Sequence, residues 1–322
     1  MKKIVYGVLR GIEYMGNVLG TLCHVFPRAV RIRLFYACGL VRRVMPATGV
    51  VYAAYFGFVY FFVRQCAHTG DLVERRFLND FTMELDVSQK AQRQIFLTKL
   101  FAQHIAKLME RYVKEGDTAV DIGGNVGFFT LVLAKYVGVA GQVYVFEPEQ
   151  DNIQKLNNNI KKNNKKHIHV YAGAVSDHVG ETVLHRNPLN EGGHTLEDQA
   201  EFKDSAKVYS REEMEQKNKD FVFEQKTKMW SLDEEFEIWK KSGRVPSFVK
   251  IDVEGHELAV LRGGRRFFAE AKPKVVCEIG EDTEQEVVAI MESLGYTTYY
   301  IDLNGGLSRP SGRRATHDIF FM

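Results

Sequence analysis

Residues 118–132 read TAVDIGGNVGFFTLV, and this stretch decides the fold. Its first five residues form a short, mostly apolar run, which predicts a buried β-strand. Residues 126–137 carry apolar side chains at helical spacing and predict a helix. Residues 123–127 (GGNVG) therefore join a strand to a helix, where the backbone can approach an anionic or zwitterionic ligand closely. This order predicts an α/β sheet with a ligand-binding loop after its first strand.

The glycine spacing of this loop narrows the class of ligand. A dinucleotide fingerprint that begins at Gly123 requires glycines where Asn125 and Phe128 stand, so a nicotinamide oxidoreductase is disfavoured. The acidic-x-Gly-x-x-x-Gly pattern of S-adenosylmethionine (SAM) binders fits, and Asp121 would then face the ammonium end of the methionine moiety. Glu147 ends the next predicted strand and can accept both hydroxyls of a ribose. The alternative is a tight turn in which the glycines have a steric role only.

The rest of the body alternates short apolar runs with segments of helical period, which predicts a mostly parallel sheet with crossover helices. The expected strands are 118–122, 142–146, 167–175, 247–253 and 274–279, and the expected helices are 126–137, 151–163 and 258–268. Residues 296–302 and 317–322 are joined by a loop without a helix, which predicts an antiparallel pair. Residues 187–228 interrupt the alternation and are expected to form an insertion.

The predicted strand 247–253 carries an unusual set of charges. Lys250, Asp252 and Glu254 alternate with apolar residues, so in an extended strand they point to one face. Because unpaired buried charges are costly, these side chains either lie at the open carboxyl end of the strand or pair with one another. His256 follows directly, and neighbouring carboxylates could raise its pKa. The two interpretations are an active-site role and an ionic network that holds the strand.

Composition and charge define two parts of the chain. A 45% hydrophobic, 26% charged sequence is typical of a globular protein and excludes disordered, collagen-like and polytopic membrane classes. Residues 1–75 hold 10 basic and 3 acidic side chains (+7), which leaves 33 basic and 38 acidic (−5) for residues 76–322. With a net charge of +2, we expect no nucleic-acid partner. Four scattered cysteines indicate neither a disulfide framework nor a zinc site.

The basic N-terminal part also contains an apolar segment. Residues 44–63 are uncharged over 20 positions, the length that spans a bilayer. The arginines before it would keep the N-terminus cytoplasmic and place the body outside, away from cytoplasmic SAM. The alternatives are an in-plane membrane contact through residues 28–63 and a helical cap or dimer face packed on the sheet. We expect a cytoplasmic protein with a 1–75 extension and a 76–322 catalytic domain; the sequence does not indicate the oligomeric state.

Four blocks of the sequence, residues 120–132, 145–160, 248–265 and 275–281, resemble the FkbM-type family of SAM-dependent methyltransferases. The third block, with KIDVEGHE followed by VLRG, is the most specific. The resemblance covers roughly residues 100–322. It implies a class I methyltransferase (Rossmann-like) fold: a mostly parallel seven-stranded sheet with one antiparallel strand and helices on both faces. It also implies O-methylation of a hydroxyl group on a sugar, glycolipid or secondary metabolite.

The resemblance further implies roles for individual residues. The expected SAM-binding residues are Asp121, Gly123, Gly124, Asn125, Gly127, Glu147 and, near the adenine, Asp177. The candidates for catalysis are Lys250, Asp252, Glu254 and His256, with His194 of the insertion as a further candidate base. A divalent metal held by Asp252 and Glu254 is an alternative to a base, although two carboxylates are an incomplete octahedral set. The competing function is a non-catalytic scaffold subunit in glycan assembly.

Overall fold

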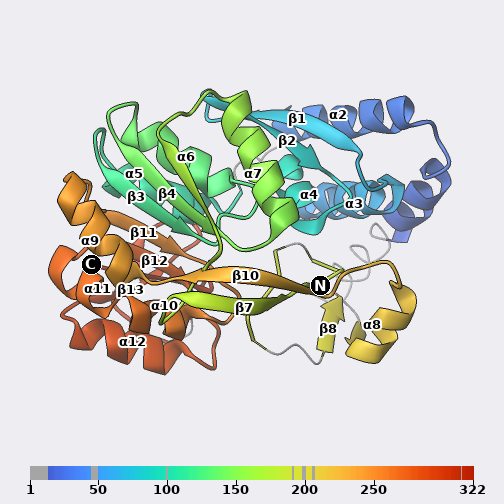
Figure 1. Cartoon of the computed structure of the whole chain (residues 1–322). Coiled ribbons are helices and arrows are strands. Elements are labelled where there is room, and N and C mark those ends of the chain that lie inside the picture. The colour runs from blue at the N-terminus through green and yellow to red at the C-terminus, as the bar shows by residue number, and fades with distance from the viewer. Residues whose placement is uncertain are drawn as a thin grey trace. The chain divides into compact units, whose positions relative to one another are not determined.

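The computed structural model describes residues 14–44, 50–98, 101–190, 192–197, 201–204, 207–312 and 314–322. It divides the chain into two compact units, Met1–Phe101 and Ala102–Met322, whose elements are labelled in Figure 1. Residues 76–101 group in space with the N-terminal unit, whereas the charge pattern places the division after residue 75. The functional division of the chain stays a prediction.

The C-terminal unit is built on an eight-stranded sheet with the strand order β14-β13-β15-β12-β11-β3-β4-β5. These strands are β3 (Thr118–Ile122), β4 (Gln142–Glu147), β5 (Ile168–Ala172), β11 (Phe248–Ile251), β12 (Lys274–Glu278), β13 (Thr298–Ile301), β14 (Leu307–Ser308) and β15 (Asp318–Phe321). The five strands from β5 to β12 are parallel, and β15 is antiparallel to both β12 and β13. The expected class I sheet is thus confirmed, and the two-residue β14 adds an eighth strand antiparallel to β13.

Helices cover both faces of this sheet, as Figure 1 shows. One face carries α5 (Gln103–Tyr112), α6 (Phe128–Val137) and α7 (Gln150–Lys162), and the other carries α9 (Leu232–Ser242), α10 (Glu257–Gly263), α11 (Arg265–Ala271) and α12 (Glu284–Ser293). Strand alternation decides which side chains face which layer. Val120 and Ile122 of β3 belong to the buried cluster around Trp239 of α9. Asp121 points to the opposite face, where α6 lies.

The segment 258–268, predicted as one helix, forms parts of two helices, because α10 ends at Gly263 and α11 begins at Arg265. A side chain at Gly263 would place its Cβ 2.0 Å from the carbonyl oxygen of Ser176. The break therefore accompanies a close backbone approach that the apolar spacing alone did not reveal.

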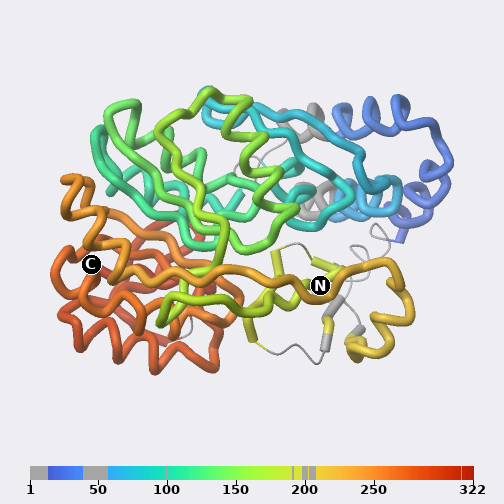
Figure 2. The backbone as a smooth tube through the Cα atoms, in the orientation of Figure 1, coloured from blue at the N-terminus to red at the C-terminus, as the bar shows by residue number. Residues whose placement is uncertain are grey.

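The predicted strand 167–175 is also divided. Ile168–Ala172 forms β5 in the main sheet, whereas β6 (Ala174–Val175) belongs to a second sheet with β10 (Glu224–Trp230) and β7 (Gly180–His185). Gly173 lies at the switch, and a Cβ there would be 2.6 Å from the indole nitrogen of Trp230. The chain therefore needs glycine where it leaves one sheet for the other. The course of the backbone can be followed in Figure 2.

The insertion forms a small substructure of its own. The hairpin of β8 (Glu201–Asp204) and β9 (Lys207–Ser210) leads into α8 (Arg211–Lys217). Ser210 and Glu213 form a reciprocal capping box at the start of α8. The insertion then continues into β10, so part of it completes the second sheet.

The N-terminal unit begins with helical residues 14–23 and continues with α2 (Arg28–Val44), α3 (Val50–Cys66), the antiparallel hairpin of β1 (Leu72–Phe77) and β2 (Phe81–Asp86), and α4 (Lys90–Leu97). Residues 45–49 of the apolar segment 44–63 lie outside the described residues, and α3 holds the remainder of that segment from Val50 onward. Within the described ranges, no helix combines the length and apolar character needed to cross a membrane.

Candidate functional site

The carboxyl edge of β3 and β11 holds a buried ionic cluster. Lys250 of β11 pairs in register with Asp121 of β3, and both side chains are almost fully buried. The Nζ atom of Lys250 lies 3.3 Å from Asp121 Oδ1 and 3.3 Å from Asp252 Oδ2. It also donates to the carbonyl oxygen of Gly123 at 3.2 Å. We call Asp121, Lys250, Asp252 and the Gly123 carbonyl the carboxyl-edge cluster.

Charge pairing outweighs burial at Lys250. Burial alone would lower the pKa of this ammonium group, but the carboxylates of Asp121 and Asp252 raise it above its usual range. Burial raises the pKa of Asp121, and the charge of Lys250 and a hydrogen bond from Thr130 Oγ1 at 2.6 Å oppose that rise. Lys250 therefore keeps its proton at neutral pH. It can stabilise negative charge at this edge but cannot remove a proton.

The glycine loop packs tightly against this cluster. Gly123 has φ +81°, and a Cβ there would lie 1.8 Å from the carbonyl oxygen of Asp252. A Cβ at Gly124 would lie 2.2 Å from the side chain of Val145, and Gly127, which precedes α6, has φ +94°. Sterics alone therefore require glycine in this loop. The assignment of a ligand rests on the charged groups around it.

Glu147 ends β4 beside the same loop, and its carboxylate is 5% exposed. It accepts from the backbone N–H groups of Asn125 at 2.7 Å and Glu149 at 3.0 Å, and from Asn152 Nδ2 at 3.4 Å. Burial raises the pKa of Glu147 to about 7, although these hydrogen bonds lower it. A carboxylate has about four acceptor positions, so about one remains for a ligand. Binding both ribose hydroxyls requires the release of one loop hydrogen bond.

His256 lies at the N-cap position of α10, where its two ring nitrogens face different partners. Nε2 is 2.9 Å from Ser176 Oγ, and Nδ1 is 3.0 Å from Glu197 Oε1. The carboxylate accepts, so Nδ1 carries the proton in a neutral ring, and the Nε2 lone pair faces the Ser176 hydroxyl. We call Ser176, His256 and Glu197 the His256 cluster. Sequence patterns did not indicate Ser176 or Glu197, because both are distant from His256 along the chain.

The turn after β11 presents the remaining acidic residues. Glu254 is exposed in a left-handed conformation (φ +51°), and its carbonyl oxygen accepts from Thr195 Oγ1 of the insertion at 2.9 Å. The Asp252 side chain is 31% exposed, and its charge is the largest cause of a raised pKa at Glu278, which ends the neighbouring strand β12. In the part of the chain that the structure describes, no group of three or more His, Cys, Asp or Glu residues is arranged to hold a metal.

Two further sequence candidates have local partners. Asp177 is exposed, and a hydrogen bond with His178 Nδ1 at 2.6 Å lowers the pKa of its carboxyl group. His194 Nδ1 accepts from the backbone N–H of Asn187 at 2.9 Å, and burial lowers the pKa of its ring to about 4. His194 is therefore neutral with its lone pair already used, which makes it a poor base.

The structure thus brings the sequence candidates together in three groups. Asp121, Lys250 and Asp252 meet directly beside Gly123, and Asn125 meets Glu147. His256 instead joins Ser176, which precedes Asp177, and Glu197 of the insertion.

Comparisons with known proteins find similar methyltransferases. A curated relative is the hexuronic acid methyltransferase AglP of Haloferax volcanii, 26% identical over 163 residues that cover 50% of this chain and 55% of that protein. Among solved structures, a methyltransferase FkbM from Methylobacillus flagellatus KT has 14% identity and a TM-score of 0.37, with 90% of this chain and 58% of that chain covered. Fibrillarin from Aeropyrum pernix, solved with SAM, has 14% identity and a TM-score of 0.39, with 80% and 85% covered. The chain thus spans a little more than half the length of the curated relative.

The family model described as the methyltransferase FkbM domain matches residues 121–298. This range contains the glycine loop, Glu147, the insertion and the charged strand, and it is more than half of the chain. The chain belongs to the FkbM methyltransferase family.

Proposed function

We propose that this protein is a SAM-dependent O-methyltransferase that acts on a hydroxyl group of a sugar, glycolipid or similar compound. The observation that carries the proposal is the carboxyl-edge cluster: a buried Asp121–Lys250 pair directly behind a glycine loop, inside the region that matches the family. Ligands of open α/β sheets bind at this edge, where the strands end.

Two carboxylates fit the proposed cofactor. Asp121 Oδ1 is buried against Lys250 Nζ at 3.3 Å, so Asp252, whose side chain is 31% exposed, is the carboxylate of the cluster that a ligand can reach. Glu147 keeps about one acceptor position at the end of β4. We assign the methionine end of SAM to the loop 123–127 and Asp252, the ribose to Glu147, and the adenine side to Asp177. Bound SAM supplies an activated methyl group on its sulfonium.

The protein must then orient the acceptor oxygen and take its proton, because a sugar hydroxyl is a weak acid. We assign proton removal to His256. Asp252 is ion-paired with a protonated Lys250, so its carboxylate is already engaged. The ring of His256 is instead oriented by Glu197, which leaves Nε2 as the basic atom. Ser176 Oγ lies 2.9 Å from Nε2 and donates to Asp177 Oδ1 at 3.3 Å, so Ser176 fixes the position of this side of the ring.

A cavity of about 490 Å³ at the same edge is our candidate for the acceptor site. It lies beyond the carboxyl ends of β12 and β13, and its polar lining includes Glu281, Glu284, Tyr300, Arg314, Thr316 and His317. Tyr300 already donates to Glu284 at 2.8 Å, so we assign the hydroxyls of a sugar ring to Glu281, Thr316 and His317. Arg314 already donates to Glu284 and to two backbone carbonyls, so it is poorly placed to bind a second carboxylate. We therefore propose a neutral sugar rather than a uronate.

An acceptor screen tests this function. The full chain is incubated with SAM labelled in its methyl group and with neutral sugars, the matching uronic acids and glycolipids. We expect label in the neutral sugars or their glycolipids, and a lower yield with the uronates. A preference for uronates would overturn the acceptor assignment. Transfer to none of them, together with no SAM binding by calorimetry, would favour the non-catalytic scaffold.

We also propose a cytoplasmic location, where SAM is available, with membrane contact through the N-terminal unit. The sequence analysis gives a contact through residues 28–63 as one alternative. The exposed apolar side chains that support a contact lie mainly before that range, at residues 14–26.

A further inference from the structure

The helical residues 14–23 turn their small and polar side chains inward. Gly16 and Gly20 pack so closely on α3 that Cβ atoms there would lie 2.6 and 2.5 Å from the carbonyl oxygens of Phe58 and Phe62. On the same side, Asn17 Oδ1 accepts a hydrogen bond from Gln65 Nε2 at 3.1 Å. These contacts fix the rotation of the helix on α3. Its other side chains must then face outward.

The outward side is apolar. Tyr14, Met15, Val18, Leu19 and Leu22 are between 41% and 70% exposed. In the next turn of the chain, Val25 is 82% exposed and Phe26 is 39% exposed. A surface helix in water normally shows the reverse arrangement, with its apolar stripe buried. We call these seven side chains the apolar face.

Exposed apolar side chains are concentrated in this part of the chain. Among the described residues, 9 of the 18 exposed large apolar side chains lie between Tyr14 and Tyr36. Single exposed apolar residues need no explanation, but a contiguous patch marks an interaction surface.

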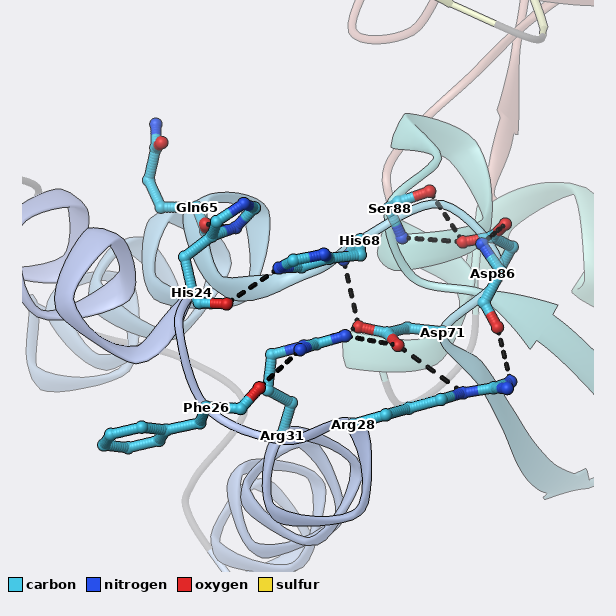
Figure 3. A network of polar contacts seen from close by, with 10 residues as sticks. His24, Phe26, Arg28, Arg31, Gln65, His68, Asp71, Asp86 and Ser88 are labelled. Atoms are coloured by element: carbon cyan, nitrogen blue, oxygen red, sulfur yellow. Dashed lines mark hydrogen bonds and ion pairs between the residues drawn. The ribbon is translucent and has the colours of Figure 1, made fainter.

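The segment that contains the apolar face is rich in arginine. Residues 14–70 contain six arginines and no aspartate or glutamate. Arg31 is neutralised by Asp71 through two hydrogen bonds of 2.9 Å, as Figure 3 shows. Arg28, with a 62% exposed side chain, shares that same carboxylate at 3.7 Å, and Arg33 is exposed. One buried carboxylate cannot balance both arginines, so this surface keeps a net positive charge.

Contacts around His24, Arg28 and His68 hold the segment that carries the apolar face in place. The rings of His24 and His68 stack at 3.7 Å, and His68 Nε2 donates to the carbonyl oxygen of His24 at 2.8 Å (Figure 3). Arg28 donates to the carbonyl oxygen of Gly70, which joins the start of α2 to the β1–β2 hairpin. The apolar side chains are therefore presented on a fixed support.

We propose that the apolar face docks on the surface of an anionic lipid bilayer. The apolar side chains enter the boundary between headgroups and acyl chains, and the exposed arginines pair with lipid phosphates. A second copy of the chain fits less well, because a two-fold interface would bring together two surfaces that each keep a net positive charge. The proposal is independent of methyl transfer, since it concerns only the N-terminal unit.

Vesicle flotation of the full chain tests the proposal. The vesicles contain phosphatidylcholine alone or phosphatidylcholine and phosphatidylglycerol in equal parts. We expect flotation with the anionic vesicles and much less with the neutral ones. The double variant Leu19→Asp/Leu22→Asp should weaken binding by at least about tenfold per residue, because each change removes a buried leucine side chain from the lipid. Arg33→Gln should weaken binding to the anionic vesicles only.

The matched control is Val139→Asp in the C-terminal unit, where the side chain is 87% exposed. It introduces the same charge at an exposed apolar position and should float like the wild type. Circular dichroism should show an unchanged helix content in every variant. Absence of flotation, or equal flotation of the double variant, would overturn the proposal. A lipid-free dimer that the double variant dissociates would also overturn it, because the apolar face would then be a protein interface.

Discussion

Replacing Lys250 with methionine keeps the length of the side chain and removes its charge. Asp121 is fully buried and would lose its only cationic partner among the described residues, keeping the hydrogen bond from Thr130. Breaking a buried ion pair by removing one partner costs about 3–5 kcal/mol. We therefore expect Lys250→Met to lower the free energy of unfolding of the C-terminal unit by that amount.

Tryptophan fluorescence during urea unfolding measures this change selectively. The two tryptophans of the chain, Trp230 and Trp239, both lie in the C-terminal unit, so the signal does not report the N-terminal unit. The double variant Lys250→Met/Asp121→Asn should recover part of the loss, because no unpaired charge remains. Lys240→Met removes an exposed lysine that pairs with Glu237 and should change little.

The loss of stability in Lys250→Met should also depend on pH. Burial raises the pKa of folded Asp121 above its unfolded value, and removal of Lys250 raises it further. Folding of the variant then takes up a proton, so its stability falls as pH rises from the unfolded pKa of about 3.9 toward the folded pKa. The variant should therefore differ least from the wild type in acid. A Lys250→Met protein as stable as the wild type at neutral pH would refute the reasoning.

Two further predictions concern the ligands of the site. Glu147 has a pKa of about 7, and only its ionised form accepts from both ribose hydroxyls, so calorimetry should show SAM affinity rising as pH passes upward through that value. Glu147→Gln should abolish this pH dependence. It should also weaken SAM binding by about 1.5–3 kcal/mol, the range for hydrogen bonds to a charged group. If the variant bound SAM as tightly as the wild type, Glu147 would not bind the ribose. Glu197→Gln should lower turnover, because Nδ1 of His256 loses the carboxylate that orients the ring, while SAM affinity stays unchanged. His256→Ala should lower turnover about 100- to 10,000-fold, and adding Glu197→Gln to this variant should lower turnover no further. Additive losses in the double variant would show that the two residues act independently.

Local sequence patterns predicted the central sheet and the glycine loop well. The apolar runs at β3, β4, β11 and β12 are short and bounded, so their period and length define them without tertiary information. The alternation of Lys250, Asp252 and Glu254 predicted that three charges share one face of a strand 247–253. Lys250 and Asp252 do meet, but β11 ends at Ile251, so Glu254 lies in a left-handed turn beyond the strand. The alternation did not show that Asp121 completes the network of Lys250 and Asp252, because strand register is a tertiary property.

The elements that sequence patterns missed depend on contacts between distant segments. The sequence pattern predicts a single strand over residues 167–175, and the packing of Gly173 against Trp230 divides this segment between two sheets. Glu197 reaches His256 because the insertion folds back on the turn after β11, where Thr195 also binds the Glu254 carbonyl. The inverted polarity of residues 14–23 likewise becomes apparent only when α3 shows which face is buried.

Calorimetric titration with SAM of the wild type and of Gly123→Ala tests the central claim most directly. A Cβ at Gly123 would lie 1.8 Å from the Asp252 carbonyl oxygen, whereas Gly116, with a similar φ of +89°, has open space around it. Gly116→Ala is therefore a control for backbone strain alone, and tryptophan fluorescence verifies folding. We predict saturable binding of SAM by the wild type and by Gly116→Ala, and loss of binding in folded Gly123→Ala. No heat with SAM in the folded wild type, or equal binding by Gly123→Ala, would contradict the claim that this loop holds the cofactor.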